Sequence, residues 1–368
     1  SIPLPDPQTV TKTLYAGYGS ADANNWTKST DGATWTPGTV PSSPIAVAKL
    51  PTGAYYFERA ATLNGKLYYP GDGYTLTTDA PILMSYDGTT DLEVLKIPYS
   101  DAAQANANNI LDMVVFNGML AFGVYDTGGS APDHRGRVLL FSPALGYLYQ
   151  VGNRFGGASG DNTGGMPFTL CSYGGKLWAG TYGVSGAAQG KIYSIRPLVD
   201  DSWTLDFTAT SGQGWITSLC PYRGKLYAGT EGDAGSSPLV KVRATTGVWT
   251  TADTGGGVTG TNGYYCSLIV FEDNLFACYY DLDGGATTLI RKYNGTTWST
   301  DLNVGTAYAA LEPGQAFVFK SNLYISFVST GQAANADGFI LKKVADGSGT
   351  GAWTRPLNAV NTRGYMAQ

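Results

Sequence analysis

Apolar and polar residues alternate in short runs along the whole chain, and these runs form a repeating group. Each group contains an aliphatic–aromatic segment that starts at a Leu, often follows Gly-Lys and often precedes a Gly. The leading leucines are Leu14, Leu67, Leu120, Leu177, Leu226, Leu275 and Leu323. They recur every 48 to 57 residues, a period that is typical of propeller blades. Alternation with a period of two predicts strands, and no segment of useful length has helical periodicity. The chain is therefore predicted to be all-β.

Each repeat contains the signals of four strands. A first strand ends four residues before the leading Leu, and a tight turn such as Asn64-Gly65 or Asn117-Gly118 follows it. Such turns favour a two-residue β-hairpin. A second Asx-Gly turn, as at Asp87-Gly88, separates the third strand from the fourth. Five of the fourth strands carry a Trp: Trp35, Trp203, Trp249, Trp298 and Trp353. Because a four-stranded blade must bury both faces against neighbours, we predict a seven-bladed β-propeller of four-stranded blades.

The two ends of the chain predict how the ring closes. The first repeat begins directly at its Leu14 strand, and residues 361–368 resemble the run that precedes other first strands. We therefore expect the N-terminal and C-terminal strands to complete one blade together, which removes an open sheet edge. Residues 1–10 are expected to form an extended Pro-rich arm, and residues 11–368 a single propeller domain.

Composition narrows the class of protein. The chain has 50 Gly and 25 Tyr, with only 14% charged residues and a net charge of −5. A chain without basic excess has no electrostatic footprint for nucleic acid or an anionic membrane. No apolar run reaches the length of a membrane span. The chain starts without an initiator Met or a signal-peptide core, which would fit a processed product. We expect a virion, extracellular or cell-surface location.

The four cysteines divide into two pairs. Cys171 and Cys220 occupy the same place in consecutive repeats, a slot that other repeats fill with apolar residues. They are therefore predicted to be buried free thiols. Cys266 and Cys278 flank a predicted hairpin turn, and a disulfide between them stays open, since such a bond needs cross-strand closeness.

One turn resembles a known motif. The run from Ser29 to Trp35, Ser-Thr-Asp-Gly-Ala-Thr-Trp, is similar to the Asp-box of sialidase-like (bacterial neuraminidase repeat, BNR) propellers, with degenerate copies at 292–298 and 85–90. The usual Asp-box has one more residue between Asp and Gly. The Gly-Lys-Leu-Tyr hairpins also look kelch-like. The resemblance implies a propeller in which the box is a turn device between third and fourth strands, remote from any active site.

Candidate catalytic groups are few. Sialidase chemistry needs an arginine cluster, a Tyr–Glu pair and an acid Asp, whereas this chain has ten Arg and five Glu and no Arg-Ile-Pro motif. Glu58-Arg59 is interpreted as a solvated ion pair and His134, the only histidine, as an exposed loop residue. A single histidine without paired thiols excludes the usual zinc sites. Glycoside hydrolysis in general needs two carboxylates, so an unrecognised glycoside hydrolase stays open.

A short acidic run gives a weak calcium candidate. Asp281 and Asp283 precede Gly284-Gly285, as in short calcium loops, but the EF-hand spacing is absent. A plain acidic turn explains the run as well. We expect no cofactor.

The residues at the ends of the Leu-led strands are the main candidates for binding. Tyr and carboxylate side chains at a channel mouth suit carbohydrate or protein contact. The candidates lie five or six residues beyond a leading Leu: Asp72, Tyr125, Asp126, Tyr182, Glu231, Tyr280 and Asp281. They differ from blade to blade, which argues against a lectin with one sugar pocket per blade.

Two function classes follow. The low charge and the Gly-, Thr-, Tyr- and Asn-rich hairpins resemble those of phage tail and decoration proteins. We therefore expect a non-enzymatic structural or attachment protein of a bacteriophage virion, such as a decoration, tail or receptor-binding component. The alternative is a secreted or cell-surface glycan-binding propeller (a lectin) or an unrecognised glycoside hydrolase. The expected partners are other virion or cell-surface proteins, or glycans.

Overall fold

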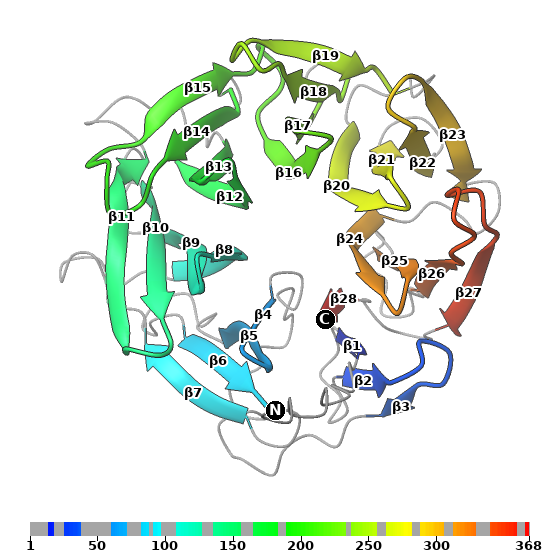
Figure 1. Cartoon of the computed structure of the whole chain (residues 1–368), viewed down its shortest axis with the longest axis horizontal. Helices are drawn as coiled ribbons and strands as arrows, with labels where there is room; N and C mark the ends of the chain where they lie inside the picture. The colour runs from blue at the N-terminus through cyan, green and yellow to red at the C-terminus, as the bar shows by residue number, and fades with distance from the viewer. Residues whose placement is uncertain are drawn as a thin grey trace, which may run out of the picture.

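The strands of this chain are arranged as blades around a central axis, seen end-on in Figure 1. The structure is a computed structural model, and it describes residues 14–17, 26–37, 60–71, 82–87, 91–96, 108–126, 135–155, 165–182, 189–232, 237–255, 263–281, 288–304, 312–328, 339–358 and 365–367. Within these ranges the strands pair into seven four-stranded antiparallel sheets. The predicted all-β propeller with four-stranded blades is confirmed.

The strands occupy four positions from the axis outward, called here first to fourth. The first strands, nearest the axis, are β28 (Tyr365–Ala367), β4 (Ala61–Leu63), β8 (Asn108–Phe116), β12 (Met166–Tyr173), β16 (Ile216–Tyr222), β20 (Gly263–Phe271) and β24 (Glu312–Phe319). The second strands are β1 (Leu14–Gly17), β5 (Lys66–Gly71), β9 (Met119–Asp126), β13 (Lys176–Tyr182), β17 (Lys225–Thr230), β21 (Asn274–Asp281) and β25 (Asn322–Val328).

The outer half of each blade completes the pattern. The third strands are β2 (Trp26–Ser29), β6 (Ile82–Tyr86), β10 (Arg135–Ser142), β14 (Lys191–Ile195), β18 (Val240–Arg243), β22 (Thr288–Tyr293) and β26 (Phe339–Lys343). The fourth strands, on the rim, are β3 (Thr36–Pro37), β7 (Asp91–Lys96), β11 (Tyr147–Phe155), β15 (Thr204–Thr208), β19 (Trp249–Asp253), β23 (Trp298–Asn303) and β27 (Trp353–Asn358).

The two ends of the chain meet in one sheet. β28 pairs antiparallel with β1, with Tyr15 opposite Ala367 and Gly17 opposite Tyr365. The C-terminal strand therefore supplies the first position of the blade that β1, β2 and β3 begin. This is the closure that the chain ends predict, and it pairs an edge of β1 that would otherwise stay open.

The turns between first and second strands share one backbone conformation. Both central residues have positive φ at Asn64-Gly65, Asn117-Gly118, Gly174-Gly175, Arg223-Gly224, Glu272-Asp273 and Lys320-Ser321. Positive φ at both positions is the type I′ geometry, whose twist matches that of the flanking strands. Asn and Gly adopt it readily, so the Asx-Gly pairs predict these hairpins correctly. Glu272-Asp273 and Lys320-Ser321 adopt it without either residue.

A β-bulge interrupts most first strands at an equivalent point. The first strand carries one extra residue at each bulge, while the second strand continues without a break. The extra residues are Leu111, Phe168, Thr217 and Cys266. A bulge bends the strand and re-aims the side chain of the extra residue. At two of the bulges, the residue that follows the extra one lies opposite a glycine of the second strand, Gly123 or Gly180. The next blade comes close to these glycines: a Cβ on Gly123 would meet Pro167, and a Cβ on Gly180 would meet Ile216.

The core lies between blades rather than within them. One cluster joins Phe116 and Leu140 of the β8–β11 blade to Leu170 and Leu177 of the β12–β15 blade. Trp203, just before the fourth strand β15, packs against Phe155 of the preceding blade, with ring centroids 5.0 Å apart. The repeated aromatic residues therefore fill the layers between blades, because each sheet face is covered by a neighbour.

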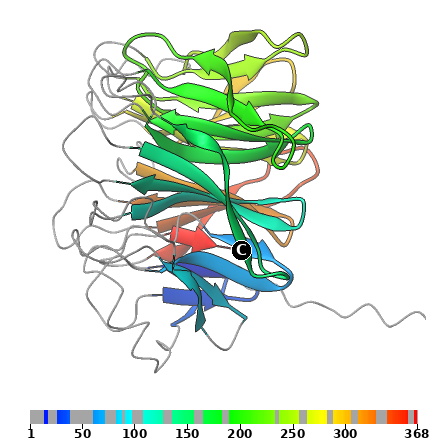
Figure 2. The same ribbon diagram turned by 90° about the vertical axis from the view of Figure 1, so that its left-hand side faces the viewer.

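Seen from the side in Figure 2, the strands run between two faces of the ring. We call the face that holds the turns between first and second and between third and fourth strands the turn face. We call the opposite face, where the second and fourth strands end, the loop face. Among the described residues, no helix has the length and apolar character needed to cross a membrane.

Candidate functional site

The structure places the described candidate residues at the ends of second strands on the loop face. Tyr125 and Asp126 end β9, Tyr182 ends β13 and Asp281 ends β21. The backbones of Tyr125, Asp126 and Asp281 are described, but not their side chains. Asp72, Asp283, Glu58, Arg59 and His134 lie outside the described residues. The calcium candidate therefore stays a prediction.

Tyr280 differs from the expectation. Its side chain is 2% exposed, and the preceding Tyr279 is fully buried. Neighbouring blades cover both faces of β21, so two successive tyrosines can both be buried there. Tyr280 belongs to the packed interior and not to an open binding rim.

Tyr182 lies in an aromatic cluster that crosses a blade boundary. Its ring meets the Trp215 ring edge-on at 4.4 Å between centroids, and the Phe168 ring lies 5.1 Å from Trp215. Tyr182 and Trp215 also form an isolated antiparallel β-bridge. All three side chains are half-buried. Phe168 is the bulge residue of β12, so the bulge aims this ring at the Trp of the next blade.

Glu231 is bonded to Trp215 through the backbone. Its backbone N–H donates a 3.0 Å hydrogen bond to the carbonyl oxygen of Trp215, and its side chain is half-buried. Trp215 is thus flanked by two of the residues that the sequence singles out, Tyr182 and Glu231. We call Phe168, Tyr182, Trp215 and Glu231 the loop-face cluster.

The segment that carries Trp215 is firmly held. It is the crossover 209–215 between β15 and β16, and it bonds to Gly190 at both ends: Ala209 N–H donates to Gly190 O, and Gly190 N–H donates to Gln213 O, each at 2.8 Å. The buried side chain of Gln213 accepts from the Thr210 hydroxyl at 3.0 Å and donates to Ser237 O at 3.3 Å. These bonds fix the backbone on which Trp215 stands.

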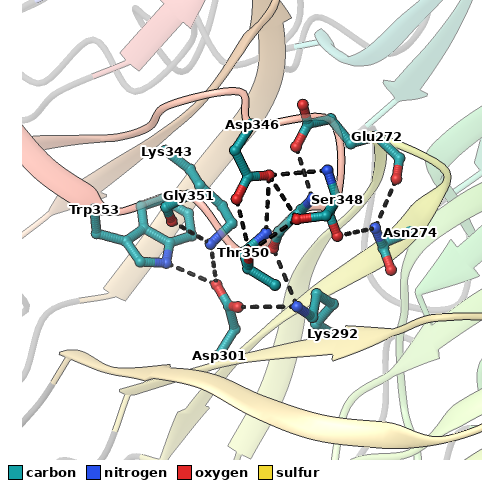
Figure 3. Close-up of polar contacts among 11 residues, drawn as sticks. Glu272, Asn274, Lys292, Asp301, Lys343, Asp346, Ser348, Thr350, Gly351 and Trp353 are labelled. Atoms are coloured by element: carbon teal, nitrogen blue, oxygen red, sulfur yellow. Dashed lines mark hydrogen bonds and ion pairs between the residues drawn. The ribbon is translucent and has the colours of Figure 1, made fainter.

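A second polar cluster lies on the turn face, between the β20–β23 and β24–β27 blades (Figure 3). The Glu272 carboxylate accepts hydrogen bonds from Gly347 N–H at 2.6 Å and Gly349 N–H at 2.8 Å. Asp346 accepts from the Thr350 hydroxyl and from Ser348 N–H, and these bonds lower the pKa of Asp346.

The deeper part of the same cluster is an ion-pair network. Asp301 accepts from Lys343 at 2.9 Å and from the Trp353 indole N–H at 2.7 Å, and Lys292 lies 3.6 Å away. Lys343 also donates to Gly351 O at 2.7 Å. The polar groups of the cluster satisfy one another, which is what a structural joint between blades requires. We assign this cluster to architecture.

Two arginines are held in similar ion pairs between blades. Arg243 pairs with Asp206 of the preceding blade at 2.7 Å, and Arg291 pairs with the buried Asp253 at 2.8 Å. Arginines held by aspartates between blades are not available to a ligand. Among the described residues, no group of three or more His, Cys, Asp or Glu side chains could hold a metal ion.

Three cysteines are described with their side chains. Cys171, Cys220 and Cys278 are free and buried. The prediction of buried thiols at Cys171 and Cys220 is confirmed. Because Cys278 is free, the alternative of a disulfide with Cys266 is not realised.

Trp215 is the site residue that the sequence analysis missed. Most other described tryptophans occupy a repeated slot, at or just before a fourth strand or in a second strand, where they pack between blades. Trp215 alone among those with described side chains lies in a crossover. A tryptophan outside the tryptophan positions of the repeat is therefore the signal that could have found it.

Comparison with known proteins supports the fold. The chain is similar to the Trypanosoma rangeli sialidase in complex with the inhibitor DANA, with 11% identity, 77% of this chain and 54% of that one covered, and a TM-score of 0.52. It is equally similar to a mutant of that sialidase displaying trans-sialidase activity (11% identity, 77% and 53% covered, TM-score 0.51). A GH74 xyloglucanase from Xanthomonas campestris also matches, with 13% identity, 85% and 49% covered, and a TM-score of 0.47.

These similarities cover only part of the matched structures and are weak in sequence. The chain spans about half the length of each of these three structures. No family model matches the chain, and no curated protein does. At such identities the two sialidase structures show the β-propeller fold alone. The virion component that the composition suggests finds no support in these comparisons.

Proposed function

We propose that the protein is a glycan-binding β-propeller whose binding site includes the loop-face cluster. The seven sheets would form one ring of seven blades, with the ligand held at the loop-face mouth of the axial channel. The observation that carries the proposal is the position of Trp215 on the loop face, where its half-buried ring meets the Tyr182 ring and its carbonyl oxygen accepts from the Glu231 N–H.

The chemistry of the cluster supports a sugar ligand. Aromatic rings offer large, rigid apolar surface, and the Tyr hydroxyl adds a hydrogen-bonding group. A sugar ring presents C–H groups on its faces and hydroxyls at its edge, so it fits an aromatic surface with hydrogen-bonding groups near it. The held crossover means that Trp215 needs no ordering when ligand binds, and preorganisation of this kind favours affinity.

The test is a glycan array followed by calorimetry on the glycans that bind. Trp215→Ala should lower the affinity about tenfold or more, because an aromatic contact contributes about 1.5 kcal/mol. Val344→Ala is the control, since it removes an exposed apolar side chain on the turn face, away from the loop-face cluster. The proposal is wrong if the intact protein binds no glycan, or if both variants bind equally well.

Hydrolysis is the second candidate, favoured by the fold that the chain shares with the sialidases. It would need Glu231 and a second carboxylate within about 5–10 Å, and Asp126 or Asp281 would supply it. Incubation with chromogenic glycosides tests this. Turnover that Glu231→Gln abolishes, while glycan binding persists, would make the protein a hydrolase; binding without turnover would make it a lectin.

One experiment tests directly whether the protein is a virion component. If the protein were a decoration or tail component, it would copurify with viral particles in a fixed ratio. A glycan-binding protein secreted or held at a cell surface would not.

A further inference from the structure

Three neighbouring blades expose large apolar side chains at their third-to-fourth strand turns. Leu198 and Val199, between β14 and β15, are 75% and 67% exposed. Leu145 and Tyr147, between β10 and β11, are exposed to a similar extent, as is Val248 between β18 and β19. The rim strands β11, β15 and β19 follow one another round the ring (Figure 1).

The corresponding turns elsewhere in the described chain differ. Residues 30–34 and 294–297 are Thr, Asp, Gly, Ala and Asn. The turn between β26 and β27 exposes one large apolar side chain, Val344, at 41%. Single exposed apolar residues are ordinary, whereas a run of them on one arc of a surface marks an interaction site. We call the turns 142–147, 196–202 and 244–248 the apolar arc.

The central turn of the arc is rigid. Arg196 donates from its backbone N–H to Asp200 at 2.8 Å and from its guanidinium at 2.6 Å, so one residue pair clamps the base of the turn. The hydrogen bond from the Arg196 guanidinium lowers the pKa of the Asp200 carboxyl, as expected for a paired carboxylate. Val199 N–H donates back to Arg196 O at 3.1 Å. Leu198 and Val199 are therefore presented on a fixed frame.

Leu198 is also held in an unfavourable backbone conformation. Its φ is +68°, in the left-handed region that residues with a bulky side chain seldom adopt. Such strain persists where the surroundings impose it, and it concentrates at functional positions. Within the monomer this leucine buries little, so the strain is not offset by packing of its own side chain.

We propose that the apolar arc is the contact surface of a homodimer, in which two copies meet across a two-fold axis near Leu198. A two-fold contact sets the same patch against itself, so the patch must be complementary to its own copy. An apolar patch whose central charges, Arg196 and Asp200, cancel one another meets this condition.

The exposed area is also sufficient. Each Leu, Val or Tyr side chain of the arc can bury roughly 100 Å². The five of them, with Leu205 on β15 at 50% exposure, supply on the order of 500 Å². That is about the apolar share of one partner's surface in a standard interface of about 800 Å² a side.

Sedimentation velocity on the full chain tests the proposal. At concentrations from about 1 to 100 µM, the protein should sediment as a species of twice the 38.7 kDa chain mass. The variant Leu198→Asp/Val199→Asp should sediment as a monomer with an unchanged circular dichroism spectrum. Val344→Asp, the same change on the opposite arc, should stay dimeric. A monomeric wild-type protein overturns the proposal.

A second measurement remains informative if the charged variant does not fold. Leu198→Cys should oxidise to a covalent dimer, because the two copies of residue 198 lie near the axis, and Val344→Cys should not. Crosslinking at both positions alike overturns the arc as the interface. So does a dimer that survives Leu198→Asp/Val199→Asp but dissociates on removal of residues 1–10, since the N-terminal arm would then be the contact.

Discussion

The carboxylate of Asp301, on the rim strand β23, accepts a 2.9 Å hydrogen bond from the ammonium of Lys343 on the next blade, and Lys343 is 1% exposed. Asp206 and Arg243 form the same kind of contact two interfaces away in the ring, at 2.7 Å. Lys343 and Arg243 lie opposite the leading leucines of their blades, Leu323 and Leu226. The repeat therefore carries an ionic contact between blades as well as an apolar one.

Removing the anion of this contact should be costly. Asp301→Asn leaves the buried Lys343 ammonium without a counter-charge, and breaking a buried pair in this way costs about 3–5 kcal/mol. Urea unfolding measures the loss. Asp200→Asn breaks an exposed pair instead and should change the unfolding free energy little. Equal effects of the two variants would contradict the structural role given to Asp301.

The rim tryptophans should differ in what their indole N–H contributes. The N–H groups of Trp353 and Trp249 donate to Asp301 and Asp206 at 2.7 Å, whereas that of Trp298 is buried with no hydrogen-bond partner in the described structure. A hydrogen bond to a charged group contributes about 1.5–3 kcal/mol.

Replacement by Phe separates the two cases. Trp353→Phe should cost about 2 kcal/mol more than Trp298→Phe in urea unfolding. The position of the aspartate on the preceding blade accounts for the difference between the two indole N–H groups. Asp301 and Asp206 lie three residues after the Trp of their own blade, whereas Asp253 lies four residues after Trp249. Asp253 binds Arg291 instead of Trp298. Equal losses for the two variants would show that the N–H bonds contribute nothing.

One hairpin can be changed so that the protein becomes more stable. Lys320 and Ser321 have φ values of +44° and +58°, which Asn and Gly adopt at lower cost. Lys320→Asn/Ser321→Gly should raise the unfolding free energy by about 1 kcal/mol. The reverse exchange, Asn117→Lys/Gly118→Ser, should lower it by a similar amount. Stabilisation that failed to appear would mean that the turn gains from Lys320 by another contact.

The Asp31 turn should make stability depend on acid pH. Hydrogen bonds from Ala33 N–H, Thr34 N–H and the Ser29 hydroxyl hold the pKa of Asp31 far below its usual value. An unfolded aspartate has a pKa of about 3.9. The contribution of Asp31 is therefore complete above about pH 5 and is lost progressively as the pH falls below about 4.

Calorimetry between about pH 2 and 7 checks this. The difference in Tm between wild type and Asp31→Asn should be largest at neutral pH and should shrink in acid. Asp201→Asn, at an exposed position, serves as the control. A difference in Tm that stays constant over the whole range would rule out the hydrogen-bonded carboxylate as its source.

The buried thiols should be unreactive in the folded protein. Burial raises the pKa of Cys220 and Cys278 to about 12, and that of Cys171 as well. Because the thiolate is the reactive form, a disulfide reagent at about pH 8 should label none of the three before unfolding. The Cys266→Ser background limits the readout to these positions. Fast labelling under native conditions would show that the interfaces between blades open.

Much of the fold could be predicted, since it rests on local signals. The expected ends of the first strands at Leu63, Phe116, Tyr173, Tyr222, Phe271 and Phe319 are where the structure ends them. These positions follow from alternation and from two-residue turns, and both act over a few neighbours. The closing pair of β1 and β28 followed from a repeat that was incomplete at each end.

The candidate site was harder to predict from the sequence. Trp215 directly precedes β16, at the register position that Met166 and Tyr264 hold in β12 and β20. Because the residue at this position changes from blade to blade, periodicity did not single out its ring. Tyr280 was expected at the channel mouth from its place at the end of a Leu-led strand, whereas its side chain is buried. The pairing of Asp301 with Lys343 joins residues 42 positions apart. Such pairs depend on how blades stack, which a single repeat does not encode.

The pairing of β28 with β1 also decides how the molecule would respond to a mechanical load. Tyr15 lies opposite Ala367, so the outward ends of both strands leave the sheet on the same side. A force that pulled the two ends apart would act on one residue pair at a time, as in opening a zip, rather than on all pairs in shear. The ring would open at this seam first, while the other six sheets, each built from one continuous stretch of chain, would stay intact.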